Sequence, residues 1–432
     1  MLLSQPIKVL PPNAKFLCNA KVTPEEVAMA WPNDIPLMAL MANGLDNNWS
    51  RWSILAPATN RQFISNDKDV IERISQLVDN DGQTTLLPNW IGYLSYECGH
   101  AIEPITGKLV TKNWPLAHLI WCDTALIYDH IKNQWWSIGE IDLPICHARV
   151  SSKWQCSPLE NNEGDLKFKD DVEKTVKYIH KGDIFQANIT RRFTTKISGN
   201  IRNAAMSALK KPGGWFGAWF EFSEHGRYLL SMSPELFLCV DGSSRRIITR
   251  PMKGTRPEKE DPIQLMASQK DAAELHMIVD LMRNDLGKIC QFGTIQVRQA
   301  RSIEKHPTVW QCVGEIEGQL NANASTQQIL EATFPPGSIT GAPKIRAMQI
   351  INELEKSPRG PYCGAIGVFG KSIFLNVAIR TATLTGTHSP VDFKGKLEYR
   401  TGCGIVSDSN AIEELHESEV KTHILNDLAN AT

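Results

Sequence analysis

Short apolar runs separated by turn residues fill the first 150 positions, and this pattern restricts the chain to a fold built on β-sheets. Three of these runs, at 51–56, 90–96 and 119–128, predict strands, with only occasional helices among them. The polar, turn-rich stretch 156–165 is the best candidate for a linker to the rest of the chain. The sequence shows no internal repeat and no low-complexity tract.

The charge balance excludes some classes of protein. Lys and Arg number 46 and Asp and Glu 47 among 432 residues, which argues against nucleic acid as the main partner. The ten cysteines form no Cys-x-x-Cys pair and have no regular spacing, so neither a zinc site nor a disulfide framework is indicated. Residues 1–6 are too short and broken for a signal peptide, and no run approaches a membrane span. We expect a soluble, cytoplasmic, globular protein with reduced and mostly buried thiols.

A helix and a strand are predicted after the linker. The helix covers 167–181, with Gly182 as a stop signal. The run 184–193 alternates like a strand, and two interpretations of its polar face stay open. That face is either solvated or forms a row of hydrogen-bonding groups along a pocket. The apolar face carries Phe185, Ala187, Ile189 and Phe193, and the polar face carries Gln186, Asn188, Thr190 and Arg192.

The stretch 249–256 contains a candidate nucleophile. Lys253 lies in a strand-like run beside a Gly-Thr turn, with Arg250 and Arg256 three residues away on either side. Flanking cations and partial burial both favour the neutral amine, which is the nucleophilic form. Taken alone, the segment is more typical of a solvated basic turn.

Glu235 ends a predicted strand, 228–235, in the sequence Ser-Pro-Glu. Its carboxylate is either an ordinary acid stabilised at a helix N-terminus or a general acid in a cleft. The second role requires that burial raise its pKa. The local sequence does not decide between the two.

Three further acids lie on predicted helices. Glu274 borders the apolar stripe of a long helix expected over 262–290, and Glu414 and Glu417 share a face of a helix expected over 411–428. Glu274 is typical of a flank residue, and Glu417 is placed for an ion pair with the lysine four residues later. The functional alternative is a hard-cation site, because Mg²⁺ prefers one or two protein carboxylates, water and anionic substrate oxygens.

Two segments are predicted to bind carboxylates. The Gly/Ser/Thr loop 334–344 runs into Pro343 at the first turn of a predicted helix, whose free backbone N–H groups would form an anion site. The loop lacks the Walker A spacing, so nucleotide phosphates are not its natural ligand and a carboxylate suits it as well. Arg380 lies in an apolar strand expected over 375–381, and a buried arginine usually pairs with a carboxylate. The expected ligand is therefore a small anionic molecule.

The order of motifs from about residue 168 to 428 resembles that of the chorismate-utilising enzymes. This family includes anthranilate synthase component I, aminodeoxychorismate synthase component I, and the isochorismate and salicylate synthases. The N-terminal half resembles the family's more divergent region, chiefly at GYLSYE (92–97). The motifs that carry the resemblance are GDIFQ (182–186), SPE (233–235), PMKGT (251–255), MIVDL (277–281), RNDL (283–286), GSITGAPK (337–344), IRT (379–381) and GIV (404–406), with Glu274, Glu414 and Glu417.

The resemblance implies an α+β fold in which two large β-sheets stack in a sandwich flanked by helices. It divides the chain into an N-terminal anthranilate synthase component I-like region, 1–155, and a chorismate-binding catalytic domain, 166–428, interwoven with the first. The substrate would be the dicarboxylate chorismate, with Mg²⁺ on its ring carboxylate. The resemblance assigns the metal to Glu274, Glu417 and Glu414, and substrate binding to Gly337, Ser338, Thr340, Gly341, Lys344, Arg380, Gly404 and Gln311.

Two positions separate the subfamilies and point to one reaction. Enzymes that add water carry a lysine where this chain has Gln186, and an amide cannot activate water, so ammonia is the implied nucleophile. Aminodeoxychorismate synthases carry a lysine at the position of Lys253, which is thought to attack C2 of chorismate and expel the 4-hydroxyl before ammonia enters at C4. Glu235 would be the acid that assists hydroxyl departure. The resemblance is therefore closest to aminodeoxychorismate synthase component I, which makes 4-amino-4-deoxychorismate for p-aminobenzoate and folate.

The chain has no amidotransferase nucleophile motif, so the resemblance implies a separate glutamine amidotransferase subunit that supplies ammonia.

The chain departs from the family pattern at three positions. At Gln311 relatives have a histidine that contacts substrate, and the other two positions are Pro336 and Cys403. A Leu-Glu-Ser element of the tryptophan-feedback type is not found near 40–43. Two alternatives stay open: anthranilate synthase component I, and a chorismate-binding regulatory homologue with impaired catalysis.

Overall fold

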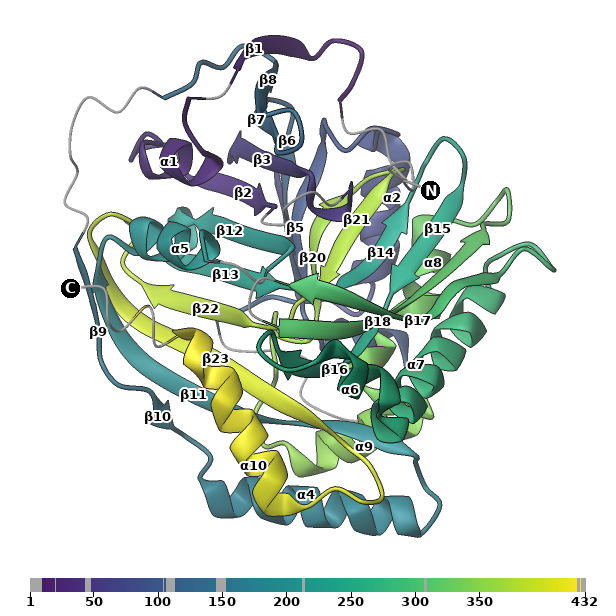
Figure 1. Cartoon of the computed structure of the whole chain (residues 1–432). Helices are drawn as coiled ribbons and strands as arrows, with labels where there is room; N and C mark the ends of the chain where they lie inside the picture. The colour runs from purple at the N-terminus through teal and green to yellow at the C-terminus, as the bar shows by residue number, and fades with distance from the viewer. Residues whose placement is uncertain are drawn as a thin grey trace.

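Two large antiparallel β-sheets form the body of the protein, and helices cover their outer faces (Figure 1). The computed structural model describes residues 10–19, 21–42, 48–103, 105, 113–144, 153–211, 214–306, 309–425 and 428. Within these residues one sheet has 13 strands and the other has 10. The predicted α+β fold with two stacked sheets is confirmed.

The first sheet runs from an edge near the start of the chain to an edge beside α4 (Asp165–His180). Off its main path, β9 (Trp154–Cys156) and β19 (Gly341–Ala342) pair with β11. The order along the path is β1 (Lys15–Asn19), β8 (Gln134–Ile138), β7 (Ala125–Asp129), β3 (Trp52–Pro57), β2 (Leu37–Met41), β12 (Phe216–Phe222), β13 (Arg227–Ser233), β22 (Thr381–Gly386), β23 (Phe393–Ile405), β11 (Gln186–Gly199) and β10 (Glu160–Asn161).

The second sheet packs against the first and carries β17 (Gln296–His306) as a partner of β18 off its main path. Its order is β16 (Met252–Pro257), β18 (Val309–Gln319), β15 (Arg246–Arg250), β14 (Leu236–Val240), β21 (Ile373–Val377), β20 (Ala365–Phe369), β5 (Asn89–Leu94), β6 (Ala117–Cys122) and β4 (Gln62–Ser65).

Both sheets combine strands from the two predicted regions of the chain. In the first sheet β2 pairs with β12, and in the second β5 pairs with β20. The stretches 1–155 and 166–428 therefore share each sheet, and neither makes a layer by itself. The division of the chain into these two regions stays a prediction.

The helices lie on the outer faces of the sandwich, and no helix in the described ranges is long and apolar enough to cross a membrane. The nine described cysteines are free thiols, and seven of them are buried, as predicted. Besides α4, the helices are α1 (Pro24–Met29), α2 (Val70–Asp81), α3 (Cys98–Ile102), α5 (Ile201–Leu209), α6 (Pro262–Ala267), α7 (Gln269–Gly287), α8 (Thr326–Thr333), α9 (Lys344–Leu354) and α10 (Ala411–Val420), with 3₁₀ segments η1 (Asn48–Ser50), η2 (Ser223–His225), η3 (Gly337–Ile339) and η4 (Lys421–Leu425).

Three clusters of buried side chains hold these layers together. One lies between the sheets, where Ile54 and Phe220 of the first sheet meet Ile91 and Ile248 of the second. Another packs α2, α4, α7, α8 and α9 against the second sheet and the ends of β11 and β23. The third packs α1 and α5 on the first sheet. Burial of this apolar surface is the main force that stabilises the sandwich.

The helix predictions are confirmed in part. The helix expected over 167–181 is α4, but the single helix expected over 262–290 is wrong. Ser268 interrupts it, because its backbone is extended and its side chain accepts a hydrogen bond from the backbone N–H of Asp271, which makes it the N-cap of α7. The helix expected over 411–428 likewise ends as α10 at Val420 and continues as η4, and residues 426 and 427 lie outside the described part.

The strand predictions are corrected at two places. The apolar run 119–128 contains two strands in different sheets, and the chain crosses between the layers at Asp123 and Thr124. The run looked continuous because almost every residue of both strands is buried. The strand expected over 375–381 is wrong at Arg380, which lies between β21 and β22 with a left-handed φ of 49°.

The alternating run 184–193 becomes β11, which begins at Gln186. Phe185 therefore precedes the strand and is 69% exposed, contrary to its predicted place on the apolar face. The interpretation of the polar face as solvated is wrong for its first three residues, because they are buried too: Gln186, Asn188 and Thr190.

The predicted linker 156–165 lies along the edge of the first sheet. Its β10 pairs with β11 through Glu160↔Thr194, and the side chain of Asn161 accepts backbone hydrogen bonds that shape the turn into α4. Residues 1–6, and position 43 of the segment 40–43, lie outside the described residues.

We expect the buried ion pair between Arg202 and Glu221 to be needed for stability. Arg202 Nε and Nη2 donate to the two Glu221 oxygens at 2.6 and 2.9 Å, and the Trp219 ring N–H adds a bond of 2.8 Å. Glu221→Gln leaves the buried guanidinium without its counter-charge and should lower the free energy of unfolding by about 3 kcal/mol in urea titrations. Glu224→Gln, at an exposed position in the turn between β12 and β13, is the control. Equal losses in the two variants would contradict this assignment.

Candidate functional site

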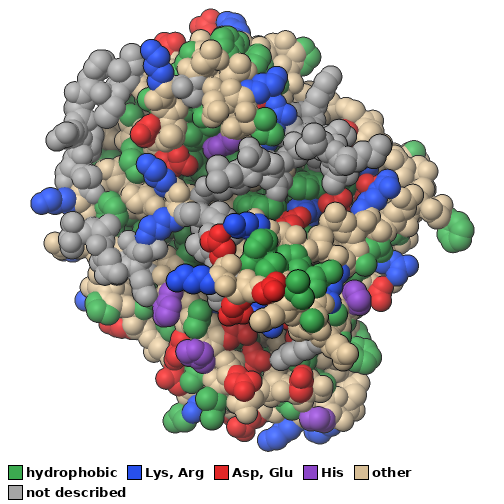
Figure 2. All heavy atoms as spheres, in the orientation of Figure 1, with side chains coloured by type: hydrophobic (Ala, Val, Ile, Leu, Met, Phe, Trp, Pro, Cys, Tyr) green, Lys and Arg blue, Asp and Glu red, His purple; other side chains and the backbone are tan. Residues whose placement is uncertain are grey.

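A cavity of about 870 Å³ lies where β23, α10 and η4 meet β16, α7 and η3. Figure 2 shows acidic side chains gathered on this face of the molecule, in the region between α10 and α6 of Figure 1. The structure brings nine of the 14 predicted site residues to the cavity wall: Glu235, Lys253, Glu274, Gln311, Ser338, Arg380, Gly404, Glu414 and Glu417.

Gly404 brings the side chains of Gln186 and Lys253 together. It lies in β23 directly opposite Asn188 of β11. A methyl group at Gly404 would lie 2.4 Å from Gln186 Nε2 and 3.0 Å from Lys253 Nζ, so both nitrogens approach this one residue. A larger residue at this position would displace the end of at least one of these two side chains. Gln186 does not itself line the cavity, but its amide lies against the Gly404 backbone that does.

Lys253 is half-buried in β16, and the two arginines that flank it are paired elsewhere. Arg250 Nε binds Glu315 at 3.0 Å, and Arg256 binds Asp271 at 3.1 Å. Each flanking cation is therefore paired with a carboxylate, and its expected effect on the Lys253 amine stays a prediction. Among the described residues Lys253 forms no salt bridge, so its amine remains available to a ligand.

Glu235 is a buried acid between β13 and β14, and no helix starts at it. The interpretation as a helix-terminal acid is therefore wrong. Only 3% of the residue is exposed, and burial raises the pKa of Glu235 to about 7. The Ser338 hydroxyl, which lies beside the carboxyl without reaching hydrogen-bond geometry, and Lys253 both limit this rise. A carboxyl that is half protonated near neutral pH suits proton donation.

Four buried polar atoms of the predicted site residues have no hydrogen-bond partner within the described residues: Gln186 Oε1 and Nε2, Gln311 Oε1 and Ser338 Oγ. Arg400 Nε and Thr401 Oγ1 in the cavity wall have none either. Leaving one such group unpaired costs about 1–3 kcal/mol, so buried polar groups are nearly always bonded. Strands β11 and β18 and the η3 turn hold the side chains of Gln186, Gln311 and Ser338 in place. The arrangement fits a polar ligand that supplies the missing partners.

The η3 turn divides the predicted anion loop between the cavity and the scaffold. Ser338 and Ile339 line the cavity, whereas Gly337 and Thr340 do not. The Thr340 hydroxyl instead donates to the carbonyls of Pro336 and Gly337 at 3.1 and 3.2 Å. These bonds hold the loop in its curved form, and the substrate-binding roles expected for Gly337 and Thr340 stay predictions.

Gly341 and Lys344 hold the same loop against its neighbours. A methyl group at Gly341 would lie 2.0 Å from the Gln186 carbonyl oxygen, so the close pairing of β19 with β11 requires glycine there. Lys344 Nζ donates to Asp285 Oδ2 at 2.5 Å and to the Thr333 carbonyl at 2.9 Å, and it does not line the cavity. The substrate-binding roles expected for both residues stay predictions.

Arg380 adds a cation to the cavity wall from the turn between β21 and β22. Burial lowers the pKa of Arg380, and the nearby Tyr399 acts in the opposite direction. A guanidinium keeps its charge at neutral pH even so, because its ordinary pKa is above about 12. A planar donor of this kind binds a carboxylate through two parallel hydrogen bonds.

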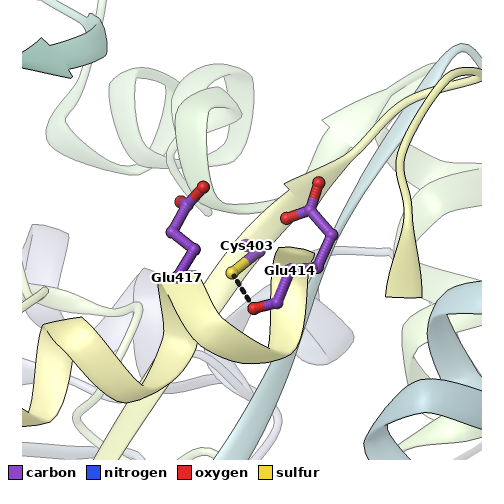
Figure 3. A group of neighbouring side chains, drawn as sticks. All are labelled: Cys403, Glu414 and Glu417. Carbon is purple, nitrogen blue, oxygen red and sulfur yellow. Dashed lines mark hydrogen bonds between the residues drawn. The ribbon is translucent and has the colours of Figure 1, made fainter. Parts of the chain in front are cut away.

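Glu414, Glu417 and Cys403 bring three potential metal ligands together (Figure 3). One carboxylate oxygen from each glutamate and the Cys403 sulfur all lie within 4.8 Å of one another. The two carboxylates extend from α10, and Cys403 lies beneath them on β23. Cys403 Sγ donates to the Glu414 carbonyl at 3.3 Å, and Glu417 accepts a bond of 2.7 Å from Lys421, the ion pair that the spacing predicted.

The carboxylate pair fits a hard cation such as Mg²⁺, which takes one or two protein carboxylates and keeps several waters. Glu414 and Glu417 would be its ligands. Glu274 lines the same cavity from α7 but is not part of the cluster with Cys403. Its role as a metal ligand stays a prediction.

Sequence reasoning missed some residues of the cavity wall. Arg400 and Gly402 precede Gly404 at two-residue intervals on β23, so strand periodicity would have placed them on the same face. Tyr362 also lines the cavity, but no local pattern marks it. It reaches the site through the turn that follows α9.

Comparison with known proteins agrees with this architecture. A family model described as chorismate binding enzyme matches residues 44–427. The chain is 32% identical over 428 residues to anthranilate synthase component 1 of Saccharolobus solfataricus, covering 93% of this chain and 96% of the relative. It is 35% identical over 312 residues to aminodeoxychorismate synthase component 1 of Escherichia coli, covering 68% and 66%. The crystal structure of anthranilate synthase component I from Streptococcus pneumoniae TIGR4 has the same fold, with a TM-score of 0.74 at 23% identity and coverage of 96% and 100%.

The Lys344–Asp285 ion pair gives a test of whether Lys344 is structural. Lys344→Met leaves the buried Asp285 with only the exposed Lys288, so we expect a loss of about 3 kcal/mol in the free energy of unfolding. Removing both charges, with Lys344→Met and Asp285→Leu together, should recover most of this loss. Urea unfolding of the two variants measures the difference. A double variant less stable than Lys344→Met would contradict the ion pair.

Proposed function

This chain belongs to the family of chorismate-binding enzymes, and on that premise we propose that it is component 1 of an aminodeoxychorismate synthase. The enzyme aminates chorismate at C4 with ammonia and gives 4-amino-4-deoxychorismate, toward p-aminobenzoate and folate. The observation that carries the proposal is the meeting of Lys253 and Gln186 at Gly404, in a cavity that also contains the buried acid Glu235.

Lys253 acts as the covalent catalyst. Its neutral amine attacks C2 of chorismate, the ring double bonds shift, and the C4–O bond breaks. The 4-hydroxyl leaves as water with a proton from Glu235. Ammonia then adds at C4, the double bonds shift back, and the C2–N bond breaks to return its electron pair to Lys253. The proton lost by the added ammonia restores Glu235, so chorismate and ammonia give the amino product and water.

Glu235 is suited to the acid role by its burial. A carboxyl with a pKa of about 7 is protonated in a large fraction of the protein molecules at neutral pH, whereas an ordinary glutamate is almost fully ionised. The charge of Lys253 lies near enough to lower that pKa, which supports a site where both groups reach the same substrate ring.

Gln186 supports ammonia over water as the second nucleophile. A primary amide has no basic nitrogen at neutral pH, so it cannot take a proton from water. Its buried oxygen and nitrogen both lack partners within the described residues, and they can bond to a substrate or to ammonia. Enzymes of the family that add water carry a lysine at this position.

The dicarboxylate substrate fits the charges of the cavity. Arg380 takes one carboxylate of the substrate through two hydrogen bonds. Ser338 of the η3 turn lies beside Glu235. Glu414, Glu417 and Glu274 would hold a Mg²⁺ ion, and this ion would neutralise the charge of the ring carboxylate. The names of the component 1 relatives imply a second component, and we propose that it is a glutamine amidotransferase subunit that supplies the ammonia.

Anthranilate synthase component 1 is the second candidate. The Saccharolobus solfataricus enzyme of that name aligns with nearly the whole chain. Lys253 argues against it, because anthranilate synthases typically have alanine at this position. Gln311, in place of a histidine, favours the further alternative of a homologue that binds chorismate without turning it over.

We expect the purified chain to convert chorismate into 4-amino-4-deoxychorismate when Mg²⁺ and ammonium are supplied. Mass spectrometry identifies the product, and fluorescence reports anthranilate. Lys253→Ala should lower amination by at least about 10²-fold, because the covalent route is lost. Lys259→Ala, at an exposed lysine after β16, is the matched control. Anthranilate as the first product would overturn the proposal, and wild-type amination by Lys253→Ala would overturn the role of the lysine.

The pH dependence of turnover should follow Glu235. The acid must be protonated to donate, so kcat/KM for chorismate should fall as pH rises above about 7, the pKa of Glu235 in the free enzyme. Glu235→Gln keeps the shape but has no proton to give, and kcat should fall by about 10²–10⁴-fold with loss of this alkaline limb. Glu224→Gln should retain the limb. A limb that persists in Glu235→Gln would show that another group supplies the proton.

A further inference from the structure

Arg359 joins two walls of the cavity from behind. Its Nη2 donates to the Asn188 carbonyl of β11 at 2.6 Å, and its Nη1 donates to the Ile339 carbonyl of η3 at 3.1 Å. Asn188 and Ile339 both line the cavity, whereas Arg359 does not. One guanidinium group therefore sets the separation between this strand and this loop.

The guanidinium is held on its remaining sides as well. Nε and Nη2 bind the two oxygens of Glu355 at 2.9 and 2.7 Å, and the Tyr96 ring lies 4.5 Å from the guanidinium carbon. Glu355 also accepts bonds of 2.9 Å from the N–H and the hydroxyl of Thr190 on β11. Arg359 is only 3% exposed, and buried charge-assisted bonds of this kind are short and strongly directional.

The backbone at Arg359 is fixed by a second carboxylate. Glu97, just beyond the end of β5, accepts the N–H groups of Arg359 and Gly360 at 2.6 and 3.0 Å. The arginine is therefore anchored through both its main chain and its side chain. Glu97, Glu355 and Tyr96, which fix its position, do not line the cavity.

We propose that Arg359 is a positioning residue for the reaction in this cavity, acting through Asn188 and Ile339. The inference rests on the proposed use of the cavity as the substrate site. Gln186 lies two residues before Asn188 on the same strand, and Ser338 directly precedes Ile339. The clamp thus holds the amide beside Lys253 on one side and the hydroxyl beside Glu235 on the other.

Lysine cannot replace this arginine without loss. The planar guanidinium reaches two carbonyls and one carboxylate at once, whereas an ammonium is a single point with a different geometry. Arg359→Lys keeps the positive charge opposite Glu355 but leaves at least one of the two carbonyls without its donor. A displacement of about 1 Å near reacting groups costs on the order of 10²-fold in rate.

The test measures chorismate consumption, whatever the product, so it does not depend on which synthase the protein is. We expect Arg359→Lys to lower kcat by about 10–100-fold with a smaller change in KM. The alkaline limb of kcat/KM should move to higher pH, because the Ser338 hydroxyl that lowers the pKa of Glu235 moves away. Ser338→Ala should cause the same shift, and the double variant should shift no further than Ser338→Ala alone.

Arg202→Lys is the matched control, because it is a buried arginine paired with one glutamate and its partners do not line the cavity. It should lose stability with unchanged kcat, KM and pH limb. If Arg359→Lys behaves in the same way, the positioning role is overturned. If Arg359→Lys does not fold, Tyr96→Leu removes the ring beside the guanidinium instead and should move the alkaline limb to higher pH. Tyr96→Phe keeps the ring and should leave the limb where it is. An alkaline limb that does not move in Tyr96→Leu would overturn the proposal.

Discussion

The antiparallel pairing of β11 with β23 is the constraint on which the rest of the site depends. Its register runs from Ala187↔Ile405 to Gly199↔Phe393, so a slip by one residue would turn Gln186 and Gly404 to opposite faces. On its other edge the start of β11 pairs with β19, where only a glycine fits against the Gln186 carbonyl. Gly341 lies against the Gln186 carbonyl and Gly404 lies against the Gln186 amide. These two contacts therefore hold the Gln186 side chain between the strand that carries Gly404 and the loop that carries Ser338.

Buried charges and buried amides are treated differently around the cavity. The charged side chains of Arg359 and Lys344 have carboxylate partners in Glu355 and Asp285. The amide oxygens of Gln186, beside the cavity, and of Gln311, in its wall, have no partner among the described residues. These two amides give up stability at the site, and a polar ligand that bonds to them would restore it.

The resemblance predicted the sandwich because the motifs occur in a known order, and nine of the 14 predicted site residues line the cavity. The sequence could not predict where the side chain of Lys344 points, since an ion pair with Asp285 depends on how α7 packs beside α9. It also missed the break at Ser268, because the helical pattern continues through an N-cap. Arg359 carried no signal, because its role depends on two carbonyl groups that only the folded chain brings together.

The buried acid links stability and function in the same pH range. The pKa of Glu235 in the folded protein, about 7, lies above its ordinary value of 4.5. The stability that this group contributes is therefore fully present below pH 4.5 and is lost as pH rises through about 7, where the ionised carboxylate is buried. Proton donation requires the same protonated form. A dianionic substrate raises the pKa of a neighbouring carboxyl further, because like charges disfavour ionisation. Under the proposed function, binding of such a substrate therefore extends to higher pH the range in which Glu235 keeps its proton, which favours both its burial and its use as the proton donor.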